Sequence, residues 1–172
     1  MQRELSSSGQ NLSSPPAEAL AAWRVFFECA LALPDILDAE LQAADKLSLR
    51  WYDLLVQLED AEGGIPMSEL ANRILTSKSG LTRVIDRMEE AGLVRRERTR
   101  DDRRVVRVVA TPQGIEALHG ARAVHRDGIR RHFADHLDVR ELERLRGTMQ
   151  KVREHVRPLR PGRVSGDGRA RS

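Results

Sequence analysis

The side chains best suited to chemistry are the polar and cationic residues gathered between positions 73 and 107. This segment carries 11 basic and 6 acidic residues, whereas residues 1–72 carry 4 basic and 12 acidic ones. Residues 151–172 are basic again, with 7 basic and 2 acidic residues. A basic segment in an otherwise acidic body favours a surface that binds a polyanion. The chemistry expected here is ion pairing with phosphates and hydrogen bonding to bases.

Arrangements typical of enzymes are not found in the sequence. There is no nucleophile-elbow glycine pattern, phosphate loop or CxxC pair, so we predict a protein that is not an enzyme and needs no cofactor. The single cysteine, Cys29, excludes an internal disulfide and fits a reducing cytoplasm. Because Phe26, Phe27 and Leu33 lie near it in the sequence, we expect a buried, unreactive thiol. A redox-sensing cysteine is the alternative.

Three histidines, His125, His132 and His136, fall on one face of a predicted helix. His132 and His136 have the spacing of a two-histidine metal site. A zinc site requires a third and a fourth ligand, and none is indicated nearby in the sequence. We therefore interpret the three histidines as a polar surface stripe and predict no metal site. Metal sensing is the alternative.

The elements that must position these residues are mostly helices. A pattern of apolar residues at spacings of three and four begins at Pro16 and continues to Leu41, with a kink or break expected at Pro34. A second helix is predicted from an N-cap at Ser48 to about Ala61, ended by Gly63-Gly64. Residues 1–16 lack the apolar region of a secretory signal and are expected to be disordered.

Two short helices follow, separated by a tight turn. Ser68 is the expected N-cap of the first, and Thr76 or Ser77 of the second, which Gly92 closes. At 100° per residue, the second helix has an apolar side and a polar side. The apolar side consists of Leu81, Val84, Ile85 and Met88, and the polar side of Ser79, Thr82, Arg83 and Asp86.

Residues 93–111 change to β character, with two Val- and Arg-rich runs around the charged tip RDDR, and they predict a β-hairpin. A long helix is expected from Pro112, its buried side marked by Ile115, Leu118, Ile129, Phe133 and Leu137. The last helix carries an apolar seam at spacings of three and four, which favours dimerisation over packing within one subunit. The seam residues are Leu142, Leu145, Met149, Val152 and Val156.

Two short helices followed at once by a basic hairpin form a winged helix-turn-helix, in a chain that is mainly α with a small β-wing. A B-DNA major groove admits one such helix, and a wing can reach the adjacent minor groove. The predicted DNA contacts of the recognition helix are Ser77, Lys78, Ser79, Thr82, Arg83 and Arg87. Those of the wing are Arg98, Arg100, Asp102, Arg103 and Arg104. The hairpin arginines could instead be merely solvated.

Asp86 lies among these residues and could accept a hydrogen bond from cytosine. An acidic residue in this position is more often an intrahelical partner of Arg83 or Arg87, and that is the interpretation we prefer.

Residues 47–114 resemble the MarR family of bacterial transcription regulators. The family's wing pattern, D-x-R-x-x-x-V-x-L-T-x-x-G, is matched here except that Ala110 replaces the usual leucine. The matching positions are Asp102, Arg104, Val108, Thr111 and Gly114. The stretch SGLTRVIDRMEEAGLV is similar to the family's recognition helix. Both motifs stand in the correct order along the chain.

The resemblance implies a homodimer of intertwined N- and C-terminal helices on a palindromic operator, with affinity lowered by a small phenolic or lipophilic effector. It also implies that Arg104 enters the minor groove while Asp102 orients it. The family's effector pocket lies near the first two helices, which hold five of the six aromatic residues. Candidate ligand contacts are Trp23, Phe27, Trp51, Tyr52 and Asp53. Placement in the core is the alternative for the aromatic residues.

We therefore expect a single MarR-like domain at 17–157, with the winged helix-turn-helix at about 47–114 and dimerisation helices at about 17–45 and 112–157. Residues 158–172 would be a basic disordered tail. The expected function is that of a cytoplasmic, nucleoid-associated, ligand-responsive repressor. A sequence-nonspecific chromosome binder is the main rival. A winged-helix module that binds only proteins would not need the basic hairpin tip.

Overall fold

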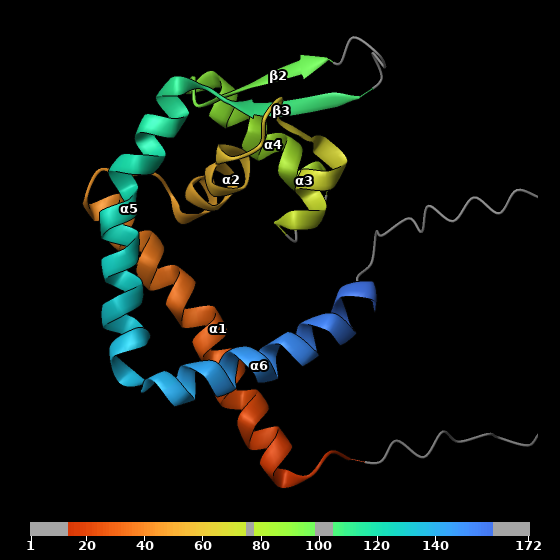
Figure 1. Cartoon of the computed structure of the whole chain (residues 1–172), viewed down its shortest axis with the longest axis vertical. Coiled ribbons are helices and arrows are strands. Elements are labelled where there is room, and N and C mark those ends of the chain that lie inside the picture. The colour runs from red at the N-terminus through yellow and green to blue at the C-terminus, as the bar shows by residue number, and fades with distance from the viewer. Residues whose placement is uncertain (1–13, 75–77, 99–104, 160–172) are drawn as a thin grey trace, which may run out of the picture. The chain divides into compact units, whose positions relative to one another are not determined.

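The chain folds into helices and one small sheet, as predicted. The computed structural model describes residues 14–74, 78–98 and 105–159, and Figure 1 labels its α-helices and the strands β2 and β3. In chain order they are α1 (Ala17–Ala43), α2 (Leu49–Glu59), β1 (Ile65–Pro66), α3 (Met67–Arg73), α4 (Lys78–Glu90), β2 (Val94–Arg98), β3 (Val106–Ala110), α5 (Pro112–His132), η1 (Ala134–His136), α6 (Val139–Val156) and η2 (Arg157–Leu159). Within the described ranges, no helix is both long and apolar enough to cross a membrane.

The chain divides into two compact units, residues 1–35 and 36–172. In the first unit, α1 carries large apolar side chains that are exposed, among them Leu20, Trp23, Phe26 and Phe27. Trp23 stacks on Phe27 with ring centroids 5.6 Å apart. Of the kink or break expected at Pro34, the break does not occur, because α1 continues through that residue. A proline removes only one hydrogen bond of a long helix.

The core of the second unit is built from the C-terminal end of α1, from α2, α3 and α4, and from the sheet and α5. Its fully buried side chains are Leu41, Leu54, Leu55, Leu70, Leu81, Ile85, Met88, Val94, Val108 and Leu118. Ser48 caps α2 as predicted, its hydroxyl accepting from the Trp51 amide at 3.3 Å. This core fixes the orientation of α4 relative to the sheet.

The sheet contains a strand that the sequence did not suggest. Its order is β1-β3-β2, all antiparallel, with Ile65 opposite Val108 and Val94 opposite Ala110. Because β1 reaches Pro66, helix α3 begins at Met67, and Pro66 occupies the N-cap position without a side-chain hydrogen bond. The predicted Ser68 cap is therefore wrong. Ser68 already lies in the first turn of the helix.

The hairpin is joined to α5 through Thr111. Its hydroxyl accepts from the Gly114 amide at 3.0 Å and donates to the Gly92 carbonyl at 2.6 Å, so one side chain caps α5 and ties it to the end of α4. Pro112 is the first residue of α5, as predicted. A Cβ on Gly114 would lie 2.1 Å from the Leu93 carbonyl oxygen, so only glycine allows this approach.

Helix α6 starts with a capping box in which Asp138 and Glu141 each accept from the other's backbone amide. Three of its predicted seam residues are exposed in the single chain: Leu145 (38%), Val152 (47%) and Val156 (44%). Leu142 and Met149 are half-buried. On α5, Leu118 is buried as predicted, but Ile129 is 37% exposed, which corrects its assignment to the buried side. The core of this unit ends before that residue.

Candidate nucleic-acid interface

The outer face of α4 is polar because the helical period separates it from the core. Leu81, Ile85 and Met88 are fully buried, and they recur every three or four residues. The intervening positions carry the residues predicted to contact DNA. Ser79, Thr82, Arg83 and Arg87 are all exposed. The structure therefore brings these four side chains together on the exposed side of one helix.

Several other predicted contacts lie outside the described residues: Ser77, Arg100, Asp102, Arg103 and Arg104. Lys78 is placed as the first residue of α4. Arg98 is exposed at the end of β2, where the strand leads into the wing tip. The neighbouring Arg95 is also exposed and pairs with Glu97 at 2.6 Å. At the described end of β2, Arg98 is thus an exposed cation, whereas the charge of Arg95 is paired with that of Glu97.

Asp86 does not pair with Arg83 or Arg87, the partners preferred from the sequence. It accepts from Arg96 of β2, whose Nη2 lies 2.6 Å from its Oδ1. Glu89 accepts from Nη1 of the same arginine at 2.5 Å. It also accepts from the backbone amide of Arg96 at 2.8 Å. Burial works against the charged form of Arg96, but these two carboxylates raise its pKa above the ordinary value. Arg96 therefore stays cationic while linking the strand to the helix.

This contact does not follow from the helical period, because Arg96 lies on a strand outside the helix. The available signal was the pair of acidic residues at i and i+3, Asp86 and Glu89, on an otherwise cationic surface. Such a pair can also bind a cation from another element, and the arginines of β2 follow the helix closely in sequence.

The aromatic candidates for ligand contact have different surroundings. Tyr52 belongs to the core and is 6% exposed, and its ring lies 4.2 Å from that of His125 on α5. Trp51 is half-buried and packs against the same core. Asp53 is exposed when its whole surface is considered. Burial of its carboxyl group nevertheless raises the pKa of that group, and the charge of His125 opposes this shift. Trp23 and Phe27 lie on the exposed part of α1.

Cys29 is exposed in this chain, so the expectation of a buried thiol is wrong. The reason is that the apolar residues around it on α1 are themselves exposed, Phe26 by 42% and Phe27 by 48%. Apolar neighbours in a sequence predict burial only where another element covers them.

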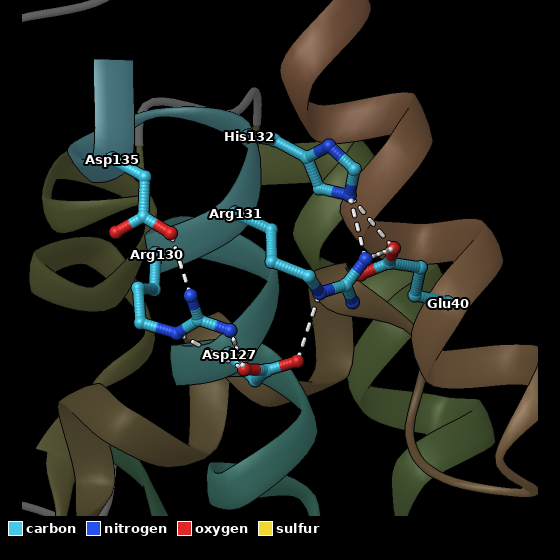
Figure 2. Close-up of polar contacts among 6 residues, drawn as sticks. All are labelled: Glu40, Asp127, Arg130, Arg131, His132 and Asp135. Atoms are coloured by element: carbon cyan, nitrogen blue, oxygen red, sulfur yellow. Dashed lines mark hydrogen bonds and ion pairs between the residues drawn. The ribbon is translucent and has the colours of Figure 1, made fainter.

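Two of the three histidines depart from the exposed stripe that was expected: His125 and His132 are half-buried, whereas His136 is exposed. His132 lies 2.7 Å from Glu40 of α1, within a network that includes Arg131 and Asp127 (Figure 2). Hydrogen bonds from His132 and then Arg131 hold the pKa of Glu40 below its ordinary value. His125 packs on Tyr52, and burial lowers its pKa, with Asp53 opposing. Across residues 14–74, 78–98 and 105–159, no group of three or more metal-ligating side chains occurs.

Comparison with known proteins identifies the arrangement. The MarR family model matches residues 45–105. The transcriptional regulator PecS of Dickeya dadantii is 30% identical over 113 residues, which cover 64% of this chain and 68% of PecS. The repressor IacR of Pseudomonas putida is 28% identical over 110 residues, 64% of each protein.

Two solved structures from Streptomyces coelicolor have the same fold. AbsC, a MarR family transcriptional regulator, is 35% identical with a TM-score of 0.79, covering 85% of this chain and 99% of its own. A second MarR family regulator, solved in complex with DNA, is 31% identical with a TM-score of 0.79, covering 86% and 92%. This chain therefore belongs to the MarR family and is a transcriptional regulator, not an enzyme.

Proposed function

We propose that this regulator binds duplex DNA by placing the outer face of α4 in a major groove and the β2–β3 wing beside it. The observation that carries the proposal is the joint exposure of Ser79, Thr82, Arg83 and Arg87 on one side of α4, opposite a side that is fully buried. A helix anchored by its apolar side presents the other side as a rigid surface. That is what readout in a major groove requires.

The individual roles follow from chemistry. Arg83 and Arg87 carry guanidinium groups that bind phosphates or the O6 and N7 atoms of guanine, and the hydroxyls of Ser79 and Thr82 donate to phosphates or bases. Arg98 continues the cationic surface onto the wing. Ser77, Lys78, Arg100, Asp102, Arg103 and Arg104 remain proposed contacts. For Arg104 and Asp102 the support is their match to the family's wing pattern.

We propose a homodimer as the DNA-binding form. The exposed apolar residues Leu145, Val152 and Val156 recur along α6 at helical spacing, together with Leu142 and Met149. Such a row in a soluble helix is suited to pack against a second copy. Two recognition helices held about 34 Å apart match one turn of DNA and a palindromic operator.

The same proposal includes a small phenolic or lipophilic effector, whose binding changes the spacing of the recognition helices and relieves repression in the cytoplasm. Its support is the aromatic and desolvated polar character of the candidate residues. Trp51, Tyr52 and Asp53 are the candidates on α2, and Trp23 and Phe27 those on α1.

The test is footprinting on the DNA upstream of the regulator's own gene, with and without phenolic compounds. We expect protection of a palindromic sequence that survives an excess of random duplex and weakens with an effector. Protection that random duplex removes completely would instead indicate a nonspecific chromosome binder.

A further inference from the structure

Among the described arginines of α4 and β2, Arg96 differs from the others because both ends of its guanidinium are occupied by carboxylates. Nη2 donates to Asp86 at 2.6 Å and Nη1 donates to Glu89 at 2.5 Å. Its side chain is only 26% exposed, against 52% for Arg95 on the same strand. Arg96 is therefore unavailable to DNA in this arrangement.

The backbone of Arg96 is held as well. Strand β2 is at the edge of the sheet, hydrogen-bonded to β3 alone. The Arg96 amide donates to Oε1 of Glu89 at 2.8 Å, while Oε2 of the same carboxylate accepts from the Arg96 side chain. Glu89 of α4 thus binds both the backbone and the side chain of Arg96 on β2. Asp86, one turn earlier on the helix, adds a third contact.

We propose that Arg96 is a positioning residue: with Asp86 and Glu89 it forms a clamp that fixes the wing strand against the recognition helix, and the preference for operator DNA depends on it. The inference rests on the DNA-binding function proposed above. A helix and a wing that enter adjacent grooves must keep a fixed mutual orientation. Preorganising that orientation removes an entropy cost of binding.

When a carboxylate of the clamp is removed, the clamp predicts a change in operator affinity opposite in sign to the change that electrostatics alone predicts. Asp86 and Glu89 place negative charge on a surface that faces a polyanion, so removing either charge should strengthen binding if charge alone mattered. If the clamp matters, removing the Glu89 charge should weaken binding to the operator. Nonspecific binding, which needs no fixed wing angle, should be unchanged or stronger.

The experiment compares Glu89→Gln with Glu90→Gln in the full chain. Both remove one negative charge from the last turn of α4, but Glu90 is not a partner of Arg96. The measurement is the ratio of affinities for the footprinted operator and for a scrambled duplex, taken well below the melting temperature of each variant. We expect this ratio to fall about fivefold or more in Glu89→Gln, the scale of one lost charge-assisted hydrogen bond, and to stay at the wild-type value in Glu90→Gln.

A second readout needs no DNA. Hydrogen exchange of the Arg96 amide should be faster in Glu89→Gln than in the wild type or in Glu90→Gln. A wild-type ratio retained by Glu89→Gln, or an unchanged exchange rate at Arg96, overturns the clamp while leaving DNA binding intact. Wild-type protein that does not distinguish operator from scrambled duplex would contradict the proposed function itself, and with it any role of the clamp in DNA preference.

Discussion

Two arginines of the basic segment show how burial decides what a side chain does. Arg83 is exposed on α4, where we propose that it contacts a base or a phosphate. Arg96 is half-buried on β2 and is held by Asp86 and Glu89. The sequence indicates that both are cationic. The sequence does not indicate which of the two arginines forms an ion pair with another element, since that depends on how a strand is placed against a helix.

Replacing Arg83 with alanine should weaken operator binding by more than about 1 kcal/mol, because a groove contact of a guanidinium is lost. Arg126→Ala, which removes an exposed arginine from α5, is the matched control and should have a much smaller effect. Fluorescence anisotropy with a labelled operator would measure both. Equal losses in the two variants would mean that Arg83 contributes only net charge.

His125 should make the stability of the protein depend on pH. Burial lowers its pKa below the ordinary 6.5, so the unfolded chain takes up a proton more readily than the folded one. The stabilisation from the neutral ring is complete above that value and is lost as the pH falls below it, toward the lowered pKa of the folded state. The melting temperature of the wild type should therefore drop between about pH 7.5 and 5.5.

The variant His125→Phe keeps an aromatic ring against Tyr52 but cannot be protonated. Its melting temperature should fall less over the same pH range than that of the wild type. His136→Phe, which changes an exposed histidine on η1, serves as the control and should follow the wild type. A His125→Phe curve that parallels the wild type would contradict this assignment.

At the scale of elements, patterns along one helix or strand were readable from the sequence and contacts between elements were not. The amphipathic period of α4, the hairpin and the Ser48 cap each depend on residues close in sequence, and all three were confirmed. The strand β1 is only two residues long, and it exists because Ile65 pairs with Val108. The pairing of Asp86 with Arg96 is likewise a contact between elements, so neither could be read from local periodicity.

Thr111 is the joint between the recognition helix, the wing and α5. Thr111→Ala should destabilise the protein by about 1–2 kcal/mol, because the N-cap of α5 and the bond to the Gly92 carbonyl are lost together. Thr111→Ser keeps the hydroxyl and should retain most of the stability. Urea unfolding would measure the difference. Equal destabilisation by both would assign the role to the methyl group instead.

At the scale of the whole molecule, the residues that were wrongly expected to be buried lie on apolar surface that is exposed in the single chain. Cys29 on α1 and Ile129 on α5 were both expected to be buried, and both are exposed in the single chain. Periodicity identifies an apolar face correctly, but it does not say whether the cover comes from the same chain. That distinction is open to measurement for α6.

Val152→Asp should convert the proposed dimer into a monomer. The substitution places a charge in the predicted seam, and losing one buried valine costs about 1.5–3 kcal/mol before the cost of burying the charge is counted. Val139→Asp, at a 71% exposed position of α6 outside the seam, is the control and should remain dimeric. Sedimentation velocity would decide. A Val152→Asp protein that remains dimeric would place the interface elsewhere.

The central claim, that the exposed face of α4 and the wing bind duplex DNA at a preferred sequence, is tested most directly by affinity as a function of salt. The measurement compares the footprinted upstream duplex with a scrambled duplex of the same composition. We expect tighter binding to the upstream duplex at every salt concentration, and a loss of about 10³-fold or more between about 50 and 200 mM as arginine contacts displace counterions. An affinity that does not change with salt, or that is equal for the two duplexes, would contradict the claim that α4 and the wing bind DNA at a preferred sequence.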